Sequence, residues 1–125
     1  NHRMALYDAV LIKENHVAAA GGITAAFSRA QQRVPHTQKI EVEVRNLEEV
    51  AEALAAGADI LLLDNMSLDE LSAAVELVGD RAITEASGGV NLESVRAIAE
   101  TGVRLISVGA LTHSYRSVDI SMLFT

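Results

Sequence analysis

A strand, a helix and a second strand follow one another in residues 40–63, which read IEVEVRNLEEVAEALAAGADILLL. The runs Ile40–Val44 and Ile60–Leu63 are rich in Ile, Leu and Val and have the length of strands. Asn46 and Glu49 have the spacing of a capping box at the start of the intervening helix. A helix that connects two strands is typical of the crossover between parallel neighbours in a sheet.

The same unit recurs along the rest of the chain. Further strand-length apolar runs lie at Ala9–Ile12, Ala82–Thr84 and Leu105–Val108. Ser67 and Glu70 form a second capping box, and Asn91 is expected to cap a later helix. The helices are expected to end at glycines in the left-handed conformation, namely Gly57, Gly79 and Gly102. An earlier helix is expected over about Val17–Arg33, with a potential break at Gly21-Gly22.

This pattern predicts an α/β fold with a parallel sheet. Five units are too few for a complete eight-fold barrel, which takes about 250 residues. We therefore expect a partial (β/α) barrel of about five to six parallel strands with covering helices, truncated on its N-terminal side, and keep an open parallel sheet as the alternative. Glu41 and Glu43 share one face of their strand, and helices on both faces would require apolar residues throughout. A face turned toward a polar barrel interior explains both carboxylates.

Composition narrows the class of protein. The chain has 125 residues, of which 50% are hydrophobic and 22% are charged, so a single packed domain or less is expected rather than disorder. A net charge of −7 argues against a general nucleic-acid partner. There is no cysteine, and no apolar run is long enough to cross a membrane. Asn1 opens the sequence without a start Met or a signal-peptide pattern, so we expect a fragment of a longer protein, with the cytoplasm as its default location.

Residues able to carry chemistry gather at the carboxyl ends of the expected strands. Lys13, Glu43 and Asp64 end the first three, Ser87-Gly88-Gly89 follows the fourth, and Gly109 follows the fifth. In parallel α/β folds all these ends lie at one rim, where active sites are built. We therefore expect one shared site at this rim.

Ser87, Gly88 and Gly89 are candidates for an anion seat, since small residues let backbone N–H groups approach a phosphate beside a helix N-terminus. Gly109 on the next loop could complete the seat, and His113 lies close behind it in sequence. The alternative is an ordinary glycine-containing turn.

The charged residues expected at the same rim could have several roles. Glu43 and Asp64 could hold a divalent cation or face a developing positive charge, or they could cap a loop or pair with Arg. Lys13 could be a Schiff-base amine, an anion clamp or a solvated side chain. His2 and Arg3 could bind anions or belong to a frayed terminus, whereas His16 and His36 are expected at the surface.

Taken in order, these segments resemble the barrel portion of quinolinate phosphoribosyltransferase, the carboxylating nicotinate-nucleotide diphosphorylase. The most specific segments are Asn1-His2-Arg3 and Leu11-Ile12-Lys13-Glu14-Asn15-His16. The resemblance continues through Glu41-Val42-Glu43-Val44, Leu63-Asp64-Asn65-Met66, Glu85-Ala86-Ser87-Gly88-Gly89, Ser107-Val108-Gly109-Ala110-Leu111-Thr112-His113-Ser114 and Asp119-Ile120-Ser121. Arg104 stands where the family usually has Asp, which is expected to alter a local ion pair.

The resemblance implies a Mg²⁺-dependent reaction. Quinolinate attacks phosphoribosyl pyrophosphate, pyrophosphate leaves, and loss of CO₂ gives nicotinate mononucleotide for NAD biosynthesis. His2, Arg3 and Lys13 would clamp the quinolinate carboxylates, and Glu43 and Asp64 would hold the metal, ribose and pyrophosphate, with Lys13, Glu43 and Asp64 as the catalytic residues. The 5′-phosphate would be seated by Ser87, Gly88, Gly89 and Gly109, with His113 nearby.

The resemblance also implies that residues 1–125 are the C-terminal part of the barrel domain. The family's N-terminal sandwich domain, which supplies an arginine to the partner subunit's site, and its first barrel strands lie outside this sequence. We therefore expect a homodimer or higher homo-oligomer for the full-length protein, and an isolated chain without activity and of low stability, because its barrel edges are exposed.

Three rival functions remain open from the residues. The first is a related pyridine-carboxylate phosphoribosyltransferase-like paralogue linked to molybdenum transport. The second is a Schiff-base barrel lyase that uses Lys13. The third is a non-catalytic module that binds a phosphate ligand, which would gain little from the two carboxylates Glu43 and Asp64.

Overall fold

The computed structural model describes residues 4, 5 and 7–124. Its five strands are β1 (Val10–Ile12), β2 (Ile40–Val44), β3 (Ile60–Asp64), β4 (Ile83–Ser87) and β5 (Leu105–Ile106). Its helices are α1 (Glu14–Ala20), α2 (Ile23–Gln31), α3 (Leu47–Ala56), α4 (Leu68–Val78), α5 (Val95–Glu100) and α6 (Ala110–His113). The sequence of the elements confirms the predicted alternation of strands and helices.

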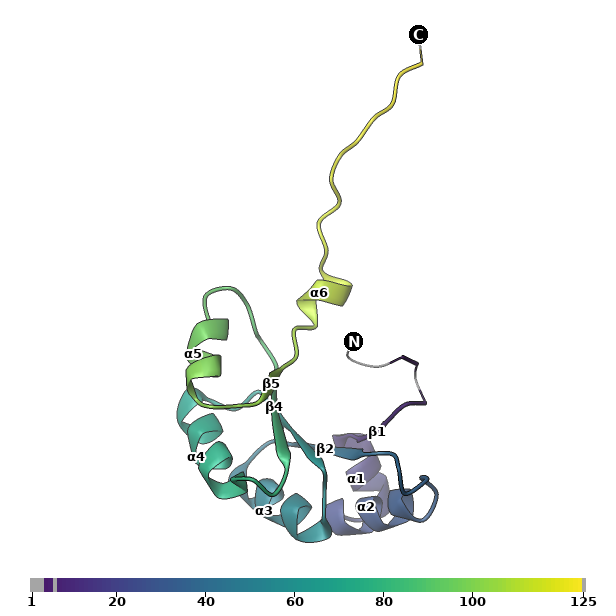
Figure 1. Ribbon diagram of the computed structural model, residues 1–125, viewed down its shortest axis with the longest axis vertical. Helices are drawn as coiled ribbons and strands as arrows, with labels where there is room; N and C mark the ends of the chain where they lie inside the picture. Colours follow the sequence, from purple (N-terminus) through teal and green to yellow (C-terminus); the bar gives the residue numbers. More distant parts are fainter. Residues whose placement is uncertain (1–3, 6, 125) are drawn as a thin grey trace.

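All five strands form one parallel sheet, in the order β1-β2-β3-β4-β5. Each strand thus lies beside the one that precedes it, without the reversal of strand order found in doubly wound open sheets. Helices α1–α5 follow the outer side of the curved sheet (Figure 1). Sequential order and one-sided helices confirm the predicted partial barrel and disfavour the open doubly wound alternative.

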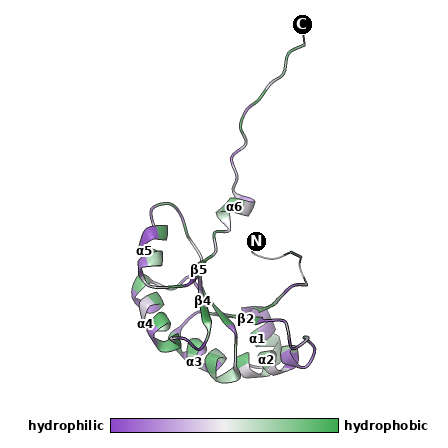
Figure 2. Cartoon of the chain, viewed as in Figure 1, coloured by the Kyte–Doolittle hydropathy of each residue, from purple (hydrophilic) through white to green (hydrophobic). Residues whose placement is uncertain are grey.

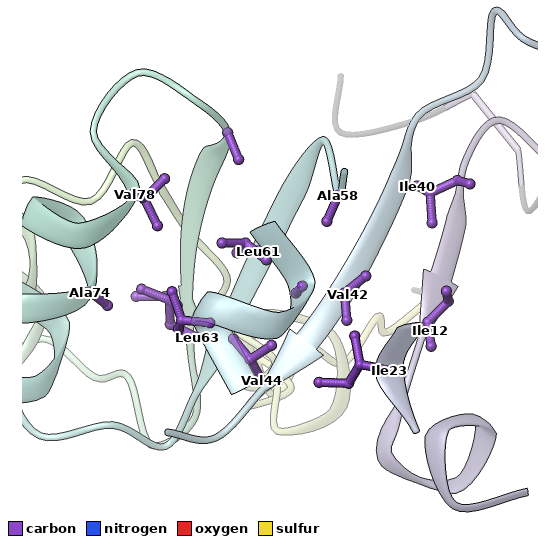
Figure 3. Packing of buried hydrophobic residues seen from close by; sticks show 14 of the residues in the cluster. Ile12, Ile23, Ile40, Val42, Val44, Ala58, Leu61, Leu63, Ala74 and Val78 are labelled. Carbon is purple, nitrogen blue, oxygen red and sulfur yellow. The ribbon is translucent and has the colours of Figure 1, made fainter. Parts of the chain in front are cut away.

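The hydrophobic core fills the space between the sheet and its outer helices. Residues of alternating position on β2 and β3 are fully buried there, namely Val42, Val44, Leu61 and Leu63. They meet apolar side chains of the helices, such as Val50 of α3 and Val78 of α4, in one continuous cluster (Figure 3). Successive residues of a strand point to opposite faces, so the intervening residues lie on the inner face.

The inner face carries polar residues among apolar ones. Strand register aligns Glu43 with Leu62, Leu62 with Glu85, and Glu85 with Leu105 across four strands. Glu43 and Glu85 are nevertheless only 8% and 6% exposed. The predicted polar interior face is therefore confirmed by two buried carboxylates, each of which needs a partner to offset its lost hydration.

Local sequence signals set most of the helix boundaries. The Asn46 side chain accepts a hydrogen bond from the Glu49 N–H at 2.9 Å, and Ser67 and Glu70 form the predicted capping box. The region from Val17 to Arg33 divides into α1 and α2, because Gly21 and Gly22 adopt φ values of 88° and 137°. Such values are strained for any other residue.

Two boundary predictions were wrong. Asn91 does not begin α5: its side chain accepts hydrogen bonds from the N–H groups of Glu93 and Ser94, which caps a turn that precedes the helix at Val95. Gly79 ends α4 with φ 55° and ψ −129°, outside the expected left-handed helical conformation. Gly57 has the left-handed conformation that was predicted.

Arg104 and the chain beyond β5 complete the architecture. The Arg104 guanidinium pairs with Asp80 at 2.9 Å, so the arginine makes an ion pair of its own at the surface. After the single-turn helix α6, residues 114–124 leave the body of the molecule as an extended segment (Figure 1). Hydrophobic and hydrophilic residues succeed one another along it (Figure 2), and its apolar side chains, from Tyr115 at 76% to Phe124 at 92%, are exposed.

None of the helices in the described part of the chain has the length and apolar character needed to span a bilayer.

Candidate active site

The structure brings the predicted rim residues to the carboxyl end of the sheet. Lys13 directly follows β1, Glu43 lies near the end of β2, and Asp64 and Ser87 end β3 and β4 as register partners. Gly109 is the N-cap of α6, just beyond β5. The shared rim is therefore confirmed for these residues, whereas His2 and Arg3 lie outside the described residues.

Lys13 and Glu43 form an ion pair across the first two strands. The Lys13 ammonium lies 3.5 Å from a carboxylate oxygen of Glu43. The Glu43 side chain is 7% exposed and that of Lys13 is 52% exposed. The pair thus joins a buried acceptor to a cation that solvent, or an anionic ligand, can still reach.

Glu14 is a third charged residue of this cluster, and the sequence reasoning missed its role. It starts α1 and shares a hydrogen bond with the Glu43 carboxyl. Burial raises the pKa of Glu43, as do this hydrogen bond and the charges of Glu14 and Asp64, whereas Lys13 lowers it. The same hydrogen bond lowers the pKa of Glu14. Glu14 and Glu43 therefore shift each other's pKa in opposite directions beside the Lys13 ammonium.

Glu43 and Asp64 could bind a metal ion only if a substrate or water supplied the remaining ligands. Among residues 4, 5 and 7–124, no group of three or more His, Asp or Glu side chains is placed to hold a metal ion. Mg²⁺ commonly takes one or two carboxylates and completes its shell with water and substrate phosphate oxygens. Glu43 and Asp64 fit that pattern, and they do not form a complete protein cage.

The loop after β4 carries the residues predicted to form an anion seat. Gly88 and Gly89 have φ values of 95° and 60°, and no atom lies within 4 Å of the position that a Cβ of Gly89 would take. A Cβ on Gly88, by contrast, would overlap the side-chain amide of Asn65. Successive residues of this kind expose backbone N–H groups that can bind an anion. Because α5 begins only at Val95, a turn and not a helix N-terminus follows the seat.

Asn65 is a second residue that sequence reasoning did not place in the site. Its backbone has φ 54° and its N–H donates to the Ser87 carbonyl at 2.9 Å. Its side-chain amide donates to the Asp64 carboxylate at 2.9 Å. Asn tolerates this left-handed backbone conformation better than most residues. From this position Asn65 both orients Asp64 and contacts the Gly88 turn.

Gly109 and His113 lie together on the loop after β5, as their spacing suggested. The His113 N–H donates to the Gly109 carbonyl at 3.1 Å, and a Cβ on Gly109 would lie 2.9 Å from His113 Nε2. The other ring nitrogen contacts the Ser114 hydroxyl at 2.8 Å. The first turn of α6 therefore folds the imidazole over Gly109.

His16 and His36 are exposed, as predicted. His16 has a structural contact with the site, because its Nδ1 accepts a hydrogen bond from the Lys13 N–H at 2.9 Å. This bond caps the first turn of α1 and fixes the backbone from which the Lys13 side chain extends.

Comparison with known proteins identifies the family. Residues 1–123 match the family model described as quinolinate phosphoribosyl transferase, C-terminal domain. The chain belongs to this family. The quinolinate phosphoribosyltransferase resemblance drawn from the motifs is thereby confirmed.

Individual members of the quinolinate phosphoribosyltransferase family show the same relationship. A probable nicotinate-nucleotide pyrophosphorylase [carboxylating] of Bacillus subtilis is 48% identical over 122 residues, which cover 98% of this chain and 42% of that protein. The solved nicotinate-nucleotide pyrophosphorylase of Francisella tularensis has 47% identity and a TM-score of 0.84, over 90% of this chain and 40% of that one. NadC of Streptococcus pyogenes has 40% identity and a TM-score of 0.87, over 99% and 44% of the two chains. The chain thus spans about two-fifths of the length of these relatives.

Proposed function

We propose that this chain carries the phosphoribosyl-transfer site of a carboxylating nicotinate-nucleotide pyrophosphorylase. The reaction transfers phosphoribosyl from phosphoribosyl pyrophosphate to quinolinate and yields nicotinate mononucleotide, CO₂ and pyrophosphate. The observation that carries the proposal is the Lys13–Glu43 pair with Asp64, on the same rim as the Gly88-Gly89 turn. An exposed cation, an acidic cluster and an anion seat are the three features that the two anionic substrates require.

Lys13 is proposed to bind a carboxylate of quinolinate, together with His2 and Arg3. Its ammonium is half exposed, although its partner Glu43 is buried, so it can turn toward an incoming anion without exposing Glu43. Borohydride trapping of a carbonyl substrate on Lys13 would instead support the Schiff-base lyase alternative.

Glu43 and Asp64 are proposed to face the reacting ribose. Displacement at the anomeric carbon develops oxocarbenium-like positive charge, and fixed carboxylates stabilise such charge most strongly where water is excluded. When bound, Mg²⁺ would neutralise the departing pyrophosphate, and Glu43 and Asp64 are the residues that would hold it, directly or through water. The Asn65 amide keeps Asp64 in position at 2.9 Å.

Ser87, Gly88, Gly89 and Gly109 are proposed to seat the 5′-phosphate, with His113 beside it. The open space at Gly89 leaves room for a phosphate group near the backbone. With the 5′-phosphate held there and the carboxylates held at Lys13, the reacting atoms are brought together without a covalent intermediate. Once ribosylated, the ring nitrogen is cationic and withdraws electrons from the adjacent carbon. The carboxylate on that carbon can then leave as CO₂, while the bonding pair stays on the carbon and takes up a proton from water.

Turnover tests the proposal in a fusion that places the upstream residues of the Bacillus subtilis relative before Asn1. We expect pyrophosphate and CO₂ to be released in equal amounts, dependent on quinolinate and Mg²⁺, and far less with the 125-residue chain alone. A folded fusion that binds phosphoribosyl pyrophosphate but releases no pyrophosphate would identify a binding module instead.

A preference for another pyridine carboxylate would identify the paralogue. If the fusion does not fold, calorimetric binding of phosphoribosyl pyrophosphate to the chain itself decides whether the seat exists. The homodimer and the cytoplasmic location stay predictions, to be checked by light scattering and by cell fractionation.

A further inference from the structure

Glu85 is a buried carboxylate for which the proposed reaction has no use. It lies at the middle of β4 and is 6% exposed, on the inner face of the sheet. The Ser107 hydroxyl donates a hydrogen bond to its carboxylate. A buried carboxylate lowers stability unless it is hydrogen-bonded, and an apolar pair at this position would support the fold at least as well. Its presence therefore calls for a role beyond packing.

Glu85 and Ser107 each lie close, in sequence, to one of the two loops that would form the anion seat. Glu85 lies on the same face of β4 as Ser87, the first residue of the seat. Ser107 follows β5 and precedes the loop that carries Gly109. The hydrogen bond between them thus joins the two strands directly below the two loops that form the seat.

The loop after β5, which carries Gly109, has few other contacts that fix its position. β5 has only two residues, which pair with Glu85 and Ala86, and Ser107 adds a backbone hydrogen bond to the Ala86 carbonyl at 2.9 Å. The helix after it has four residues. Because so short an edge strand orders weakly, the spacing between Gly109 and the Gly88-Gly89 turn depends on the contacts around Ser107.

We propose that Glu85 is a positioning residue: through the Ser107 hydroxyl it sets the distance between the two halves of the anion seat and so tunes the seat for the 5′-phosphate of the ribosyl donor. This inference rests on the proposed function. It predicts that loss of the Glu85–Ser107 bond weakens binding of the phosphate end of the donor and leaves the pyrophosphate end, at Glu43 and Asp64, unaffected.

The test measures binding of ribose 5-phosphate and of inorganic pyrophosphate with Mg²⁺ to the 125-residue chain, by ³¹P NMR titration. We expect Ser107→Ala to weaken ribose 5-phosphate binding about tenfold, which corresponds to the lower end of the range for one hydrogen bond to a charged group. Pyrophosphate binding should be unchanged, and Ser107→Thr, which restores a hydroxyl, should recover binding of the sugar phosphate. Ser72→Ala is the matched control, since the Ser72 hydroxyl donates to the Leu68 carbonyl at 2.9 Å on the exposed side of α4.

A double-mutant cycle with Glu85→Leu, whose side chain cannot accept the Ser107 hydrogen bond, tests whether Glu85 and Ser107 act through this one bond. If both residues act through one hydrogen bond, the double variant binds ribose 5-phosphate no more weakly than the weaker single variant. In the active fusion, the Michaelis constant for phosphoribosyl pyrophosphate should rise while that for quinolinate stays constant.

Two results overturn the inference alone. One is a Ser107→Ala chain that melts at a lower temperature yet binds ribose 5-phosphate as tightly as the unchanged chain. The other is an equal loss of both ligands, which would indicate a general disturbance of the rim. Absence of ribose 5-phosphate binding by the unchanged chain would overturn the proposed function as well.

Discussion

The ammonium of Lys13 and the buried carboxylate of Glu43 lie 3.5 Å apart at the carboxyl ends of the neighbouring strands β1 and β2. Glu14 joins them through its hydrogen bond to Glu43, and the charge of Asp64, on β3, helps to raise the pKa of Glu43. The Lys13 ammonium thus offsets the repulsion between the neighbouring carboxylates, which would otherwise lower stability. In the absence of substrate, the ion pair keeps Lys13 directed at the rim.

Replacement of Glu43 by Gln should abolish most of the transfer activity of the fusion. The neutral amide cannot stabilise the positive charge that develops on the ribose, and we expect a fall in kcat of about 10²- to 10³-fold, as for other preorganised electrostatic groups. Glu41→Gln is the matched control, because Glu41 is on the same strand and face, one pleat away from the carboxyl end. Equal losses in both variants would show that the effect is not specific to the rim.

The same substitution should stabilise the fold at neutral pH. The pKa of Glu43 is raised above its ordinary value of 4.5, chiefly by burial, so the native state holds this proton more tightly than the unfolded chain. Stability from Glu43 is therefore present below pH 4.5 and is lost as the pH rises through the native pKa. We expect Glu43→Gln to melt at a higher temperature than the unchanged chain at pH 7, with the difference shrinking toward pH 4.5.

Glu14 should oppose this trend in a separate pH range. Its pKa is lowered by the hydrogen bond to Glu43, so its contribution is present above its unfolded pKa and is lost as the pH falls through the native one. Thermal melts of Glu14→Gln between pH 3 and 5 resolve this effect. A pH profile identical to that of the unchanged chain would contradict the shared hydrogen bond.

Substitution of Gly88 by Ala should damage the anion seat and the fold together. The residue has φ 95°, which adds about 1–2 kcal/mol of strain for an L-residue, and its new Cβ would displace the Asn65 side chain from Asp64. We expect lower thermal stability and loss of phosphoribosyl pyrophosphate binding by calorimetry. Gly21→Ala is the control, since Gly21 has φ 88° but open space around it; it should lower stability without affecting binding.

Asn65→Gly should separate backbone conformation from side-chain function. Glycine keeps the positive φ of 54° without strain but removes the amide that holds Asp64 at 2.9 Å. We expect kcat of the fusion to fall about tenfold, the effect of one hydrogen bond to a charged group, with little change in melting temperature. Unaltered kcat would show that Asp64 needs no support from Asn65.

The extended segment after α6 should be the first part of the isolated chain to be cleaved. Tyr115 and Val118, on either side of Arg116, are 76% and 80% exposed, and segments with few buried contacts open most easily. Limited trypsin digestion followed by mass spectrometry should therefore give a stable product that ends at Arg116. Earlier cleavage after Arg29 of α2 or Arg96 of α5 would contradict this order of stability.

Short-range sequence patterns are enough to predict the strands and helices and the end of the sheet where the candidate site lies. Strand-length apolar runs, capping residues such as Asn46 and Ser67, and glycines with positive φ act over a few residues, so they can be read locally. The parallel topology then places Lys13, Glu43, Asp64 and Ser87 at one rim without further information, since all strands point the same way.

Which side chains contact one another at this rim depends on the packing of distant segments and could not be predicted from local patterns. The contacts Glu14–Glu43, Asn65–Gly88 and Glu85–Ser107 join residues on different strands and loops. Strand register and burial set these contacts, and neither leaves a short-range signal. The extent of β4 and β5 was misjudged for the same reason: β4, between two neighbours, is paired as far as Ser87, whereas β5, whose described neighbour is β4 alone, ends after two residues. Pairing between strands is a property of the folded chain, because each hydrogen bond of a sheet needs a partner that is distant in sequence.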